Sequence, residues 1–388
     1  MTNLNGPATA PRIAGRLAPT LPGECYTDPA VLTREMEAIF ENQWFFVGRT
    51  ADLPARGDVL RVDVGRENVI VVRDRGGELH AFLNVCRHRG AVLCHSDRAN
   101  VGNAIRCPYH AWAYRLDGSL IVAPNWEELA GDLDRDFYGL VPVRLDTWQG
   151  MIWVNVSGDA GPLEEHLAPQ LEFRLGGRVD RLDRYRIADL AVGDRREYTV
   201  GANWKIIQEN FQECYHCESI HPELVEQIPS FVDFEQLLSH EGYNRDGYPF
   251  AMAKEAFSLS GTATLPTLPG ITGEEERRYF GMVLRPNAFL SLLPDHVIMH
   301  RFIPVSVDET RVVCEWLFDP EAAASPDFDC SDTVGLFHRV NLQDFQASEW
   351  CQPNMGSRAY RQGGALVPGE KEIIGDYYHA WYRQSMGM

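Results

Sequence analysis

The sequence predicts an α+β protein with two domains, a small antiparallel β domain and a larger domain of helices and strands. The first observation is an alternation of apolar and polar residues with a period of two, which begins at Asp58 and is interrupted by turn signals such as Gly76-Gly77 and Leu116–Ser119. The second is that longer helical patterns occur between strand-like segments beyond residue 158. The length of 388 residues is enough for roughly two or three domains of about 100–200 residues each.

The expected small domain covers residues 45–155, and the expected larger domain combines residues 1–44 with 156–388. A helix over residues 28–46 opens the chain, because Asp28 can cap it and Pro29 fits the first helical position. The strands expected in the small domain are 59–64, 68–73 and 78–85. In the larger domain we expect strands at 196–200, 288–293, 296–304 and 310–318, and helices at 203–217 and 332–351.

The composition indicates the cellular compartment and the kinds of partner that we expect for this protein. The formal net charge of −19 argues against nucleic acid and anionic membranes as partners, because both require basic patches. The chain shows no secretory signal pattern and no run of about 18 apolar residues, so we expect a cytoplasmic protein with no membrane contact. Its nine cysteines are then expected to be free thiols or metal ligands rather than a disulfide framework.

Two short motifs in the β domain pair a cysteine with a histidine. Cys86-Arg-His88 is followed, after 18 intervening residues, by Cys107-Pro-Tyr-His110. Two thiolates and two imidazoles suit a 2Fe–2S cluster in which one iron takes the cysteines and the other the histidines. A structural zinc site is the alternative, but zinc motifs usually pair Cys with Cys and His with His, so the mixed halves favour the cluster.

A second group of candidate ligands lies in the larger domain. Glu213 and His216 are three residues apart and would share a helical face, while Pro222 places His221 in the exit from that helix. Asp344 falls on the less polar stripe of the helix at 332–351 and could complete a set of two histidines and one carboxylate for iron. Each residue alone has an ordinary alternative, a hydrogen-bonded core histidine or a surface aspartate.

The motifs resemble those of one family. The runs at 86–90 and 107–112 resemble the Rieske domain of ring-hydroxylating and related oxygenases almost residue for residue. The stretch 203–224 resembles the iron-binding segment of their large subunits, and Gln343-Asp344 with the residues that follow resembles the segment that supplies the carboxylate. With the opening helix, the resemblance covers nearly the whole chain.

The resemblance implies a Rieske domain joined to a helix-grip (START/Bet v1-like) catalytic domain. It implies a 2Fe–2S cluster held by Cys86, His88, Cys107 and His110, and mononuclear Fe(II) held by His216, His221 and Asp344. It also implies a homotrimer in which Glu213 carries electrons between His110 of one subunit and His216 of the next. Because the chain shows no Gly-x-Gly-x-x-Gly motif, electrons are expected from a separate NAD(P)H-dependent reductase.

Glu213 narrows the expected substrate. Most ring-hydroxylating members have aspartate at this position, whereas glutamate is similar to the branch that demethylates betaines, carnitine and stachydrine-type quaternary amines. An alkylammonium group binds well between aromatic rings, whose faces attract cations. The candidate pocket aromatics are Tyr243, Tyr248, Phe250, Phe280, Phe289 and Phe302, and the candidate carboxylate donors are Arg285, Arg301, His296 and His300.

Two alternatives remain open at this point. The same metals could hydroxylate or dihydroxylate an aromatic acid, in which case the product is a phenol or a diol rather than formaldehyde. The chain could also be an electron carrier with a cluster and an attached binding domain, although that leaves the second group of candidate ligands unexplained.

Iron content separates the oxygenase from the carrier. We expect about three irons per chain for one cluster and one mononuclear site, and about two for a carrier. Iron and acid-labile sulfide are measured on the purified protein. A ratio of one iron to one sulfide would contradict the oxygenase prediction.

Overall fold

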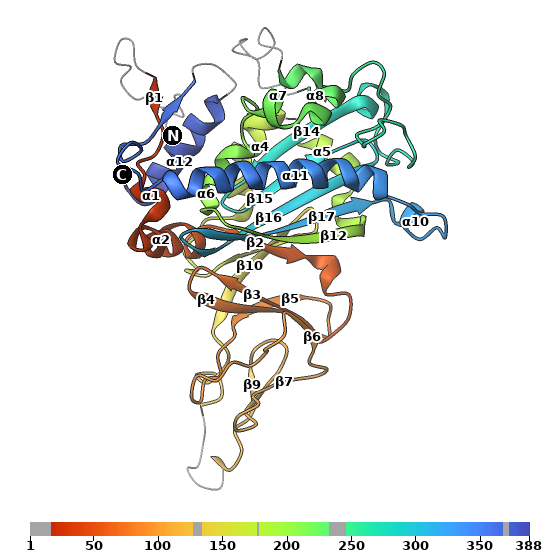
Figure 1. Cartoon of the computed structure of the whole chain (residues 1–388). Helices are drawn as coiled ribbons and strands as arrows, with labels where there is room; N and C mark the ends of the chain where they lie inside the picture. Colours follow the sequence, from red (N-terminus) through yellow and green to blue (C-terminus); the bar gives the residue numbers. More distant parts are fainter. Residues whose placement is uncertain (1–16, 127–133, 177, 233–245, 368–371) are drawn as a thin grey trace. The chain divides into compact units, whose positions relative to one another are not determined.

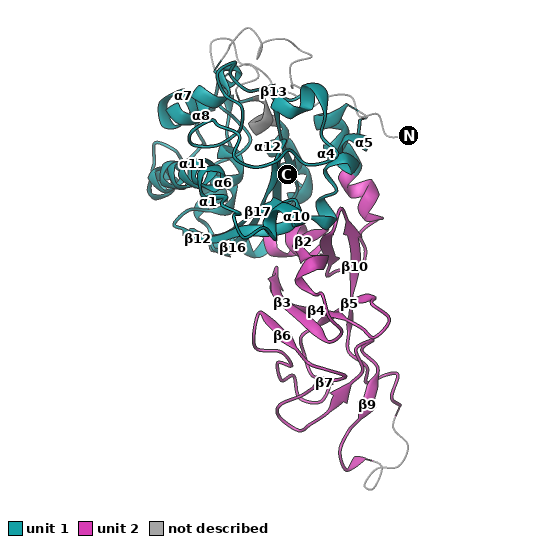
Figure 2. Cartoon of the chain, turned by 90° about the vertical axis from the view of Figure 1, so that its right-hand side faces the viewer, with its two compact units in different colours: residues 1–34, 168–388 teal, residues 35–167 magenta. Residues whose placement is uncertain are grey.

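The computed structural model describes residues 17–126, 134–176, 178–232, 246–367 and 372–388. These residues form two compact units, one of residues 35–167 and one that combines residues 1–34 with 168–388 (Figure 2). The predicted α+β class, a small β domain and a larger mixed domain, is confirmed. No helix in the described ranges is long and apolar enough to cross a bilayer.

The smaller unit is built on antiparallel strands. Its main sheet has the order β2-β11-β10-β5-β4-β3-β6, and a second sheet of three short strands has the order β7-β8-β9. The strands are β2 (Phe45–Arg49), β3 (Asp58–Val64), β4 (Glu67–Arg73), β5 (Leu79–Leu83), β6 (Arg98–Asn100), β7 (Ile105–Arg106), β8 (Ala113–Tyr114), β9 (Leu120–Val122), β10 (Pro142–Trp148) and β11 (Met151–Asn155). A π-helix, η1 (Met36–Glu41), and a 3-10 turn, η2 (Thr50–Asp52), belong to the same unit.

The larger unit is a six-stranded antiparallel sheet with a long helix, α11 (Ser331–Cys351), running across it (Figure 1). The sheet order is β12-β17-β16-β15-β14-β13. The strands are β12 (Ala191–Val200), β13 (Tyr248–Pro249), β14 (Arg278–Leu284), β15 (Ala288–Leu292), β16 (His296–Ser306) and β17 (Glu309–Phe318). Every residue of β15 is buried, so both faces of the sheet are covered at that strand.

Shorter elements complete the larger unit. A two-stranded pair joins β1 (Ala18–Pro19) to β18 (Ala365–Leu366). The helices are α1 (Glu24–Thr27), α2 (Pro29–Glu35), α4 (Leu163–Leu175, which starts in the smaller unit), α5 (Asp180–Tyr185), α6 (Trp204–Asn210), α7 (Cys217–Ile220), α8 (Pro222–Gln227), α10 (Pro320–Ala323) and α12 (Ile373–Met386), with 3-10 turns η3 (Ile187–Asp189), η4 (Pro229–Phe231), η5 (Gly273–Arg277) and η6 (Gln352–Asn354).

Two predicted helices differ from the structure. The helix expected over 28–46 is divided into α2 and the π-helical turn η1, which ends at Glu41. The helix expected over 203–217 ends at Asn210, and a turn of six residues separates it from α7. In that turn the carboxylate of Glu213 accepts the backbone N–H of Tyr215, a side-chain contact that takes the place of a helical hydrogen bond.

Asn203 fixes the start of α6, the helix that leads into this turn. Its side-chain oxygen accepts the backbone N–H of Lys205 at 3.0 Å, and its amide nitrogen donates to the carbonyl of Val307 at 2.7 Å. Asn203 is fully buried, so its loss removes a partner from the N–H of Lys205 and from the carbonyl of Val307 in the interior of the protein.

Replacing Asn203 with alanine should therefore destabilise the protein. Loss of the cap and of the buried partner costs about 2–3 kcal/mol, which corresponds to a fall of roughly 3–6 °C in the melting temperature. Differential scanning calorimetry measures this fall. The control is Asp319→Ala, which removes the cap of α10 at the surface. Equal falls for both variants would show that burial of Asn203 adds nothing to its role as a cap.

Candidate active site

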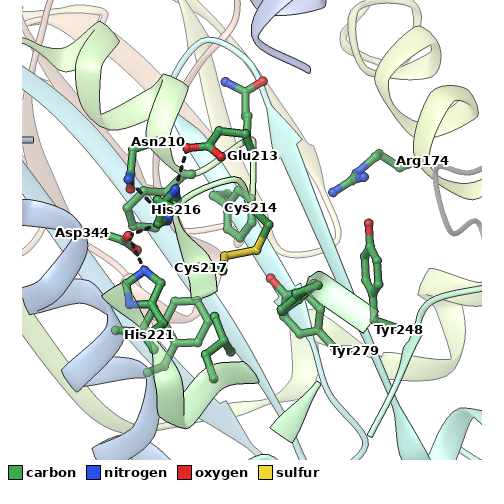
Figure 3. Close-up of a pocket in the computed structure, with 17 residues that line it drawn as sticks. Arg174, Asn210, Glu213, Cys214, His216, Cys217, His221, Tyr248, Tyr279 and Asp344 are labelled. Carbon is green, nitrogen blue, oxygen red and sulfur yellow. Dashed lines mark hydrogen bonds and ion pairs between the residues drawn. A yellow bond between two sulfur atoms is a disulfide. The ribbon is translucent and has the colours of Figure 1, made fainter. Parts of the chain in front are cut away.

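A pocket in the larger unit contains the second group of candidate ligands (Figure 3). Its empty volume is about 840 Å³, open solvent at its mouth included. The lining comes from α4, the turn after α6, α7, α8, the sheet and α11, segments that are distant in the sequence. The pocket therefore exists only in the folded chain.

Three candidate ligands meet at one end of this pocket. The Nε2 atoms of His216 and His221 lie 3.2 and 2.7 Å from the same carboxylate oxygen, Oδ1 of Asp344. The ligand atoms of the three residues all lie within 4.8 Å of one another. Two imidazole nitrogens and one carboxylate oxygen are the donor set of non-haem ferrous oxygenases, so these residues fit a mononuclear iron ion.

Local structure explains how two nearby histidines converge. His216 is the N-cap residue of α7, and His221 lies between the end of α7 and the start of α8, where Pro222 begins a new helix. The two rings are 5.1 Å apart and inclined at 78°, so they approach Asp344 from different directions. The prediction that Glu213 and His216 share a helical face was wrong, because both lie in the turn between α6 and α7.

Each histidine is oriented through its other ring nitrogen. His221 Nδ1 donates to Oε1 of Gln343 at 2.7 Å, and the amide of Gln343 donates in turn to Glu223 at 2.9 Å. His216 Nδ1 donates to Oε1 of Glu213 at 2.5 Å. With Nδ1 held by these acceptors, each Nε2 faces Asp344 and is the nitrogen that can bind a metal once its proton is lost, as is usual for histidines that bind metals.

Hydrogen bonds within the site favour the charged forms of His216 and Asp344. Burial disfavours the imidazolium form of His216, but its hydrogen bonds to Asp344 and Glu213 outweigh this and raise its pKa to about 10. Burial likewise disfavours the carboxylate form of Asp344, but hydrogen bonds from His216 and His221 lower its pKa to about 2. A divalent ion bound here would displace the protons from the two Nε2 atoms and take their place beside the carboxylate.

The four candidate cluster ligands lie in the smaller unit. Cys86 and Cys107 are each 2% exposed, and the rings of His88 and His110 are 4.6 Å apart. The Nδ1 atom of His110 is buried and has no hydrogen-bond partner among the described residues, as expected of an atom that binds a metal. Burial and the nearby His110 lower the pKa of His88, which favours the neutral form that can act as a ligand.

The spacing of these four residues favours a cluster over a zinc ion. Ligand atoms around tetrahedral zinc lie about 3.3–3.8 Å apart. In the described part of the chain, however, no three of these four residues have ligand atoms within 4.8 Å of one another. Two iron atoms bridged by sulfide need such a wider separation, so the donor set fits a 2Fe–2S cluster.

Only some of the predicted pocket aromatics line the pocket. Tyr248 and Phe289 line the pocket. Phe250 and Phe302 are buried in core clusters, Phe280 lines only a smaller neighbouring cavity, and Tyr243 lies outside the described residues. Other aromatic lining residues were not singled out from the sequence, namely Phe211, Phe231, Tyr279 and Phe337.

The predicted carboxylate donors do not line the pocket. His296 is paired with Asp295 at 2.7 Å, His300 contacts Asn341 at 3.0 Å, and the guanidinium of Arg285 lies over Trp381. Arg301 is also absent from the lining. The lining instead includes Arg174, from the last turn of α4, which the sequence analysis missed because α4 is distant in sequence from both groups of ligands.

The pocket wall also contains a disulfide. Cys214 and Cys217 are joined by a bond between their sulfur atoms, so the expectation that all nine cysteines are free thiols or metal ligands was wrong for this pair. The bond closes the turn that carries His216, and both residues line the pocket (Figure 3).

Comparison with known proteins agrees with this arrangement of two metal sites in one chain. The Rieske [2Fe-2S] domain profile matches residues 43–133, and the profile of the ring hydroxylating alpha subunit (catalytic domain) matches residues 187–388. The chain belongs to the ring-hydroxylating alpha subunit family, and is a Rieske non-haem iron oxygenase. The family uses a 2Fe–2S cluster and a mononuclear iron, which are the two cofactors predicted.

Similar relatives cover nearly the whole chain. The glycine betaine monooxygenase oxygenase subunit of Chromohalobacter salexigens is 30% identical over 95% of this chain and 86% of its own length. The carnitine monooxygenase oxygenase subunit of Acinetobacter baumannii is 29% identical over 94% of this chain and 93% of its own. The solved structure of the quaternary ammonium Rieske monooxygenase CntA with L-carnitine superposes with a TM-score of 0.72, at 25% identity over 95% of this chain and 96% of that chain.

A His216→Ala variant tests the candidate iron site. We expect it to lose the mononuclear iron and turnover, because one of three protein ligands is removed, while the visible absorption of the cluster is unchanged. The matched control is His338→Ala, which removes a histidine of α11 that contacts Tyr198 and does not line the pocket. Retention of all iron by His216→Ala would exclude His216 as a ligand.

Proposed function

We propose that this chain is the oxygenase component of an enzyme that removes a methyl group from a quaternary or tertiary amine such as a betaine. The observation that carries the proposal is an aromatic-lined pocket that ends at His216, His221 and Asp344. Two of the most similar relatives are glycine betaine and carnitine monooxygenase oxygenase subunits, which supports the same substrate class.

The proposed reaction balances with O₂ and an external reductant. A trimethylammonium group, O₂, two electrons and two protons give the hydroxymethyl ammonium product and water. The new C–O bond replaces one C–H bond of a methyl group. Cleavage of the C–N bond then releases formaldehyde, a proton and the dimethylamine. The electrons come from NAD(P)H through a separate reductase, and when bound, the two iron centres supply the activation of O₂.

The residues of the chain bind and orient the substrate in this proposal. Ring faces of Tyr248, Tyr279 and Phe289 would hold the alkylammonium group, which accepts no hydrogen bonds and is attracted to aromatic faces. Gln343 and Glu213 keep the two histidines in position through their Nδ1 atoms. Leu224 and Val340 are apolar lining residues and would help to exclude water.

We also propose that Glu213 links the two metal sites of neighbouring subunits in a homotrimer. Its side chain is 17% exposed, and one of its oxygens is 2.5 Å from His216 Nδ1. It can therefore contact a candidate iron ligand and a group from outside the unit at the same time. His110 of the neighbouring subunit is the proposed outside group.

A second candidate function is oxidation of an aromatic acid. A relative named for an aromatic substrate without a carboxylate supports the aromatic part of this candidate: the alpha subunit of biphenyl 2,3-dioxygenase from Rhodococcus jostii is 32% identical over 58% of this chain and 47% of its own length. The aromatic lining would also stack against a planar ring.

A single turnover with a labelled substrate distinguishes the two functions. The protein is reduced without oxygen, mixed with an N-trideuteromethyl betaine, and exposed to O₂. We expect dideuterated formaldehyde, detected by mass spectrometry after trapping, because only an N-methyl group can supply it. The His216→Ala variant, treated in the same way, should give none. Hydroxylated product from an aromatic acid, with no formaldehyde from any amine, would favour the second function.

A further inference from the structure

We propose that Arg174 binds the carboxylate of a zwitterionic substrate, so that the enzyme selects betaines over ammonium compounds without a carboxylate, such as choline. This inference rests on the proposed amine demethylation, and it names the group that positions the substrate in that pocket.

Arg174 is placed to meet the far end of a bound substrate. It lies in the last turn of α4, is half-buried, and is the only lysine or arginine among the described residues that line the pocket. In the view of Figure 3 its guanidinium points into the pocket from the side opposite His221 and Asp344. A planar guanidinium can donate two parallel hydrogen bonds to a carboxylate, which fixes both its position and its orientation.

The space for a carboxylate lies in the main pocket, which Arg174 lines and whose empty volume is about 840 Å³ with open solvent included. Arg174 and Tyr248 also line a second, much narrower cavity, whose other walls include Phe280 and Met282.

The groups that line the pocket suit those of a betaine. In Figure 3 the metal ligands and Arg174 lie on opposite sides of the pocket, and Tyr279 lies on the side of Arg174, beyond the disulfide of Cys214 and Cys217. Tyr279 contacts Phe231 and Tyr248 at centroid distances of 5.8 and 6.4 Å, so the three rings form one aromatic wall. A betaine with one methyl group at the metal end places its ammonium group near this wall and its carboxylate toward Arg174.

Charge gives Arg174 a second role in orientation. A ferrous ion beside Asp344 and Glu213 would leave no net charge at the metal end, because the two carboxylates balance the ion. Arg174 is a cation at the other end, so the carboxylate of a betaine is attracted toward Arg174. Its loss should therefore weaken binding and also misplace the methyl groups.

Nearby arginines have a different role. Arg181 is buried and pairs with Glu275 at 2.8 Å, Arg184 pairs with the same carboxylate at 3.0 Å, and Arg178 pairs with Asp246 at the surface. None of these three lines the pocket. They stabilise the α4–α5 region, and Arg178 supplies a matched control.

The test compares Arg174→Gln, Arg174→Lys and Arg178→Gln with the unchanged holoenzyme. Substrates are glycine betaine, carnitine and, as the compound without a carboxylate, choline. For Arg174→Gln we expect kcat/KM for the betaine that is turned over to fall roughly 100-fold, mainly through KM, and kcat/KM for choline to change less than about threefold. Arg174→Lys should recover part of the loss, and Arg178→Gln should match the unchanged enzyme.

Binding without turnover gives an independent measurement. Anaerobic titration calorimetry of the holoenzyme with the same betaine should show a roughly 100-fold higher Kd for Arg174→Gln at unchanged iron content. Unaltered betaine binding, or an equal loss for betaine and choline, would overturn the role of Arg174 alone. Failure of the unchanged enzyme to release formaldehyde from any ammonium compound would overturn the proposed function, and this inference with it.

Discussion

The larger unit depends on one buried carboxylate shared by two imidazoles. Asp344 is 5% exposed, and a carboxylate at such a position is stable only when other groups compensate its charge. His216 and His221 do so in the structure through contacts to one oxygen atom. The inward stripe of α11, the turn before α7 and the start of α8 all serve to bring these three side chains to one point.

The same constraint explains why the chain leaves helical geometry between Asn210 and Cys217. A continuous helix would place Glu213 and His216 on one face, but it would not turn the imidazole of His216 toward α11. Between α6 and α7 the chain forms a turn instead, and the disulfide of Cys214 and Cys217 links residues of this turn. In this turn one oxygen of Glu213 contacts His216, while the side chain of Glu213 remains partly exposed.

The two metal sites differ in how far apart in the sequence their residues lie. The cluster site is local, because its ligands lie within 25 residues of one another and are held by neighbouring loops of one small unit. The iron site and its pocket combine segments from α4 to α11, so their shape depends on how the sheet and helices pack. Polar groups at the ends of that pocket, Arg174 and Asp344, come from helices about 170 residues apart.

The sequence by itself determined the α+β class, the long helix with Asp344 on its inward stripe, and the motifs of both candidate metal sites. These are local features, since spacing along one strand, helix or loop already fixes which side chains can act together. Only the tertiary structure decided the break after Asn210, the exclusion of Phe250 and Phe302 from the pocket, and the presence of Arg174 in it. An aromatic side chain packs in a core as well as in a pocket, and an arginine lies at the surface as readily as at the wall of a pocket, so the place of each depends on contacts between distant segments that no local pattern encodes.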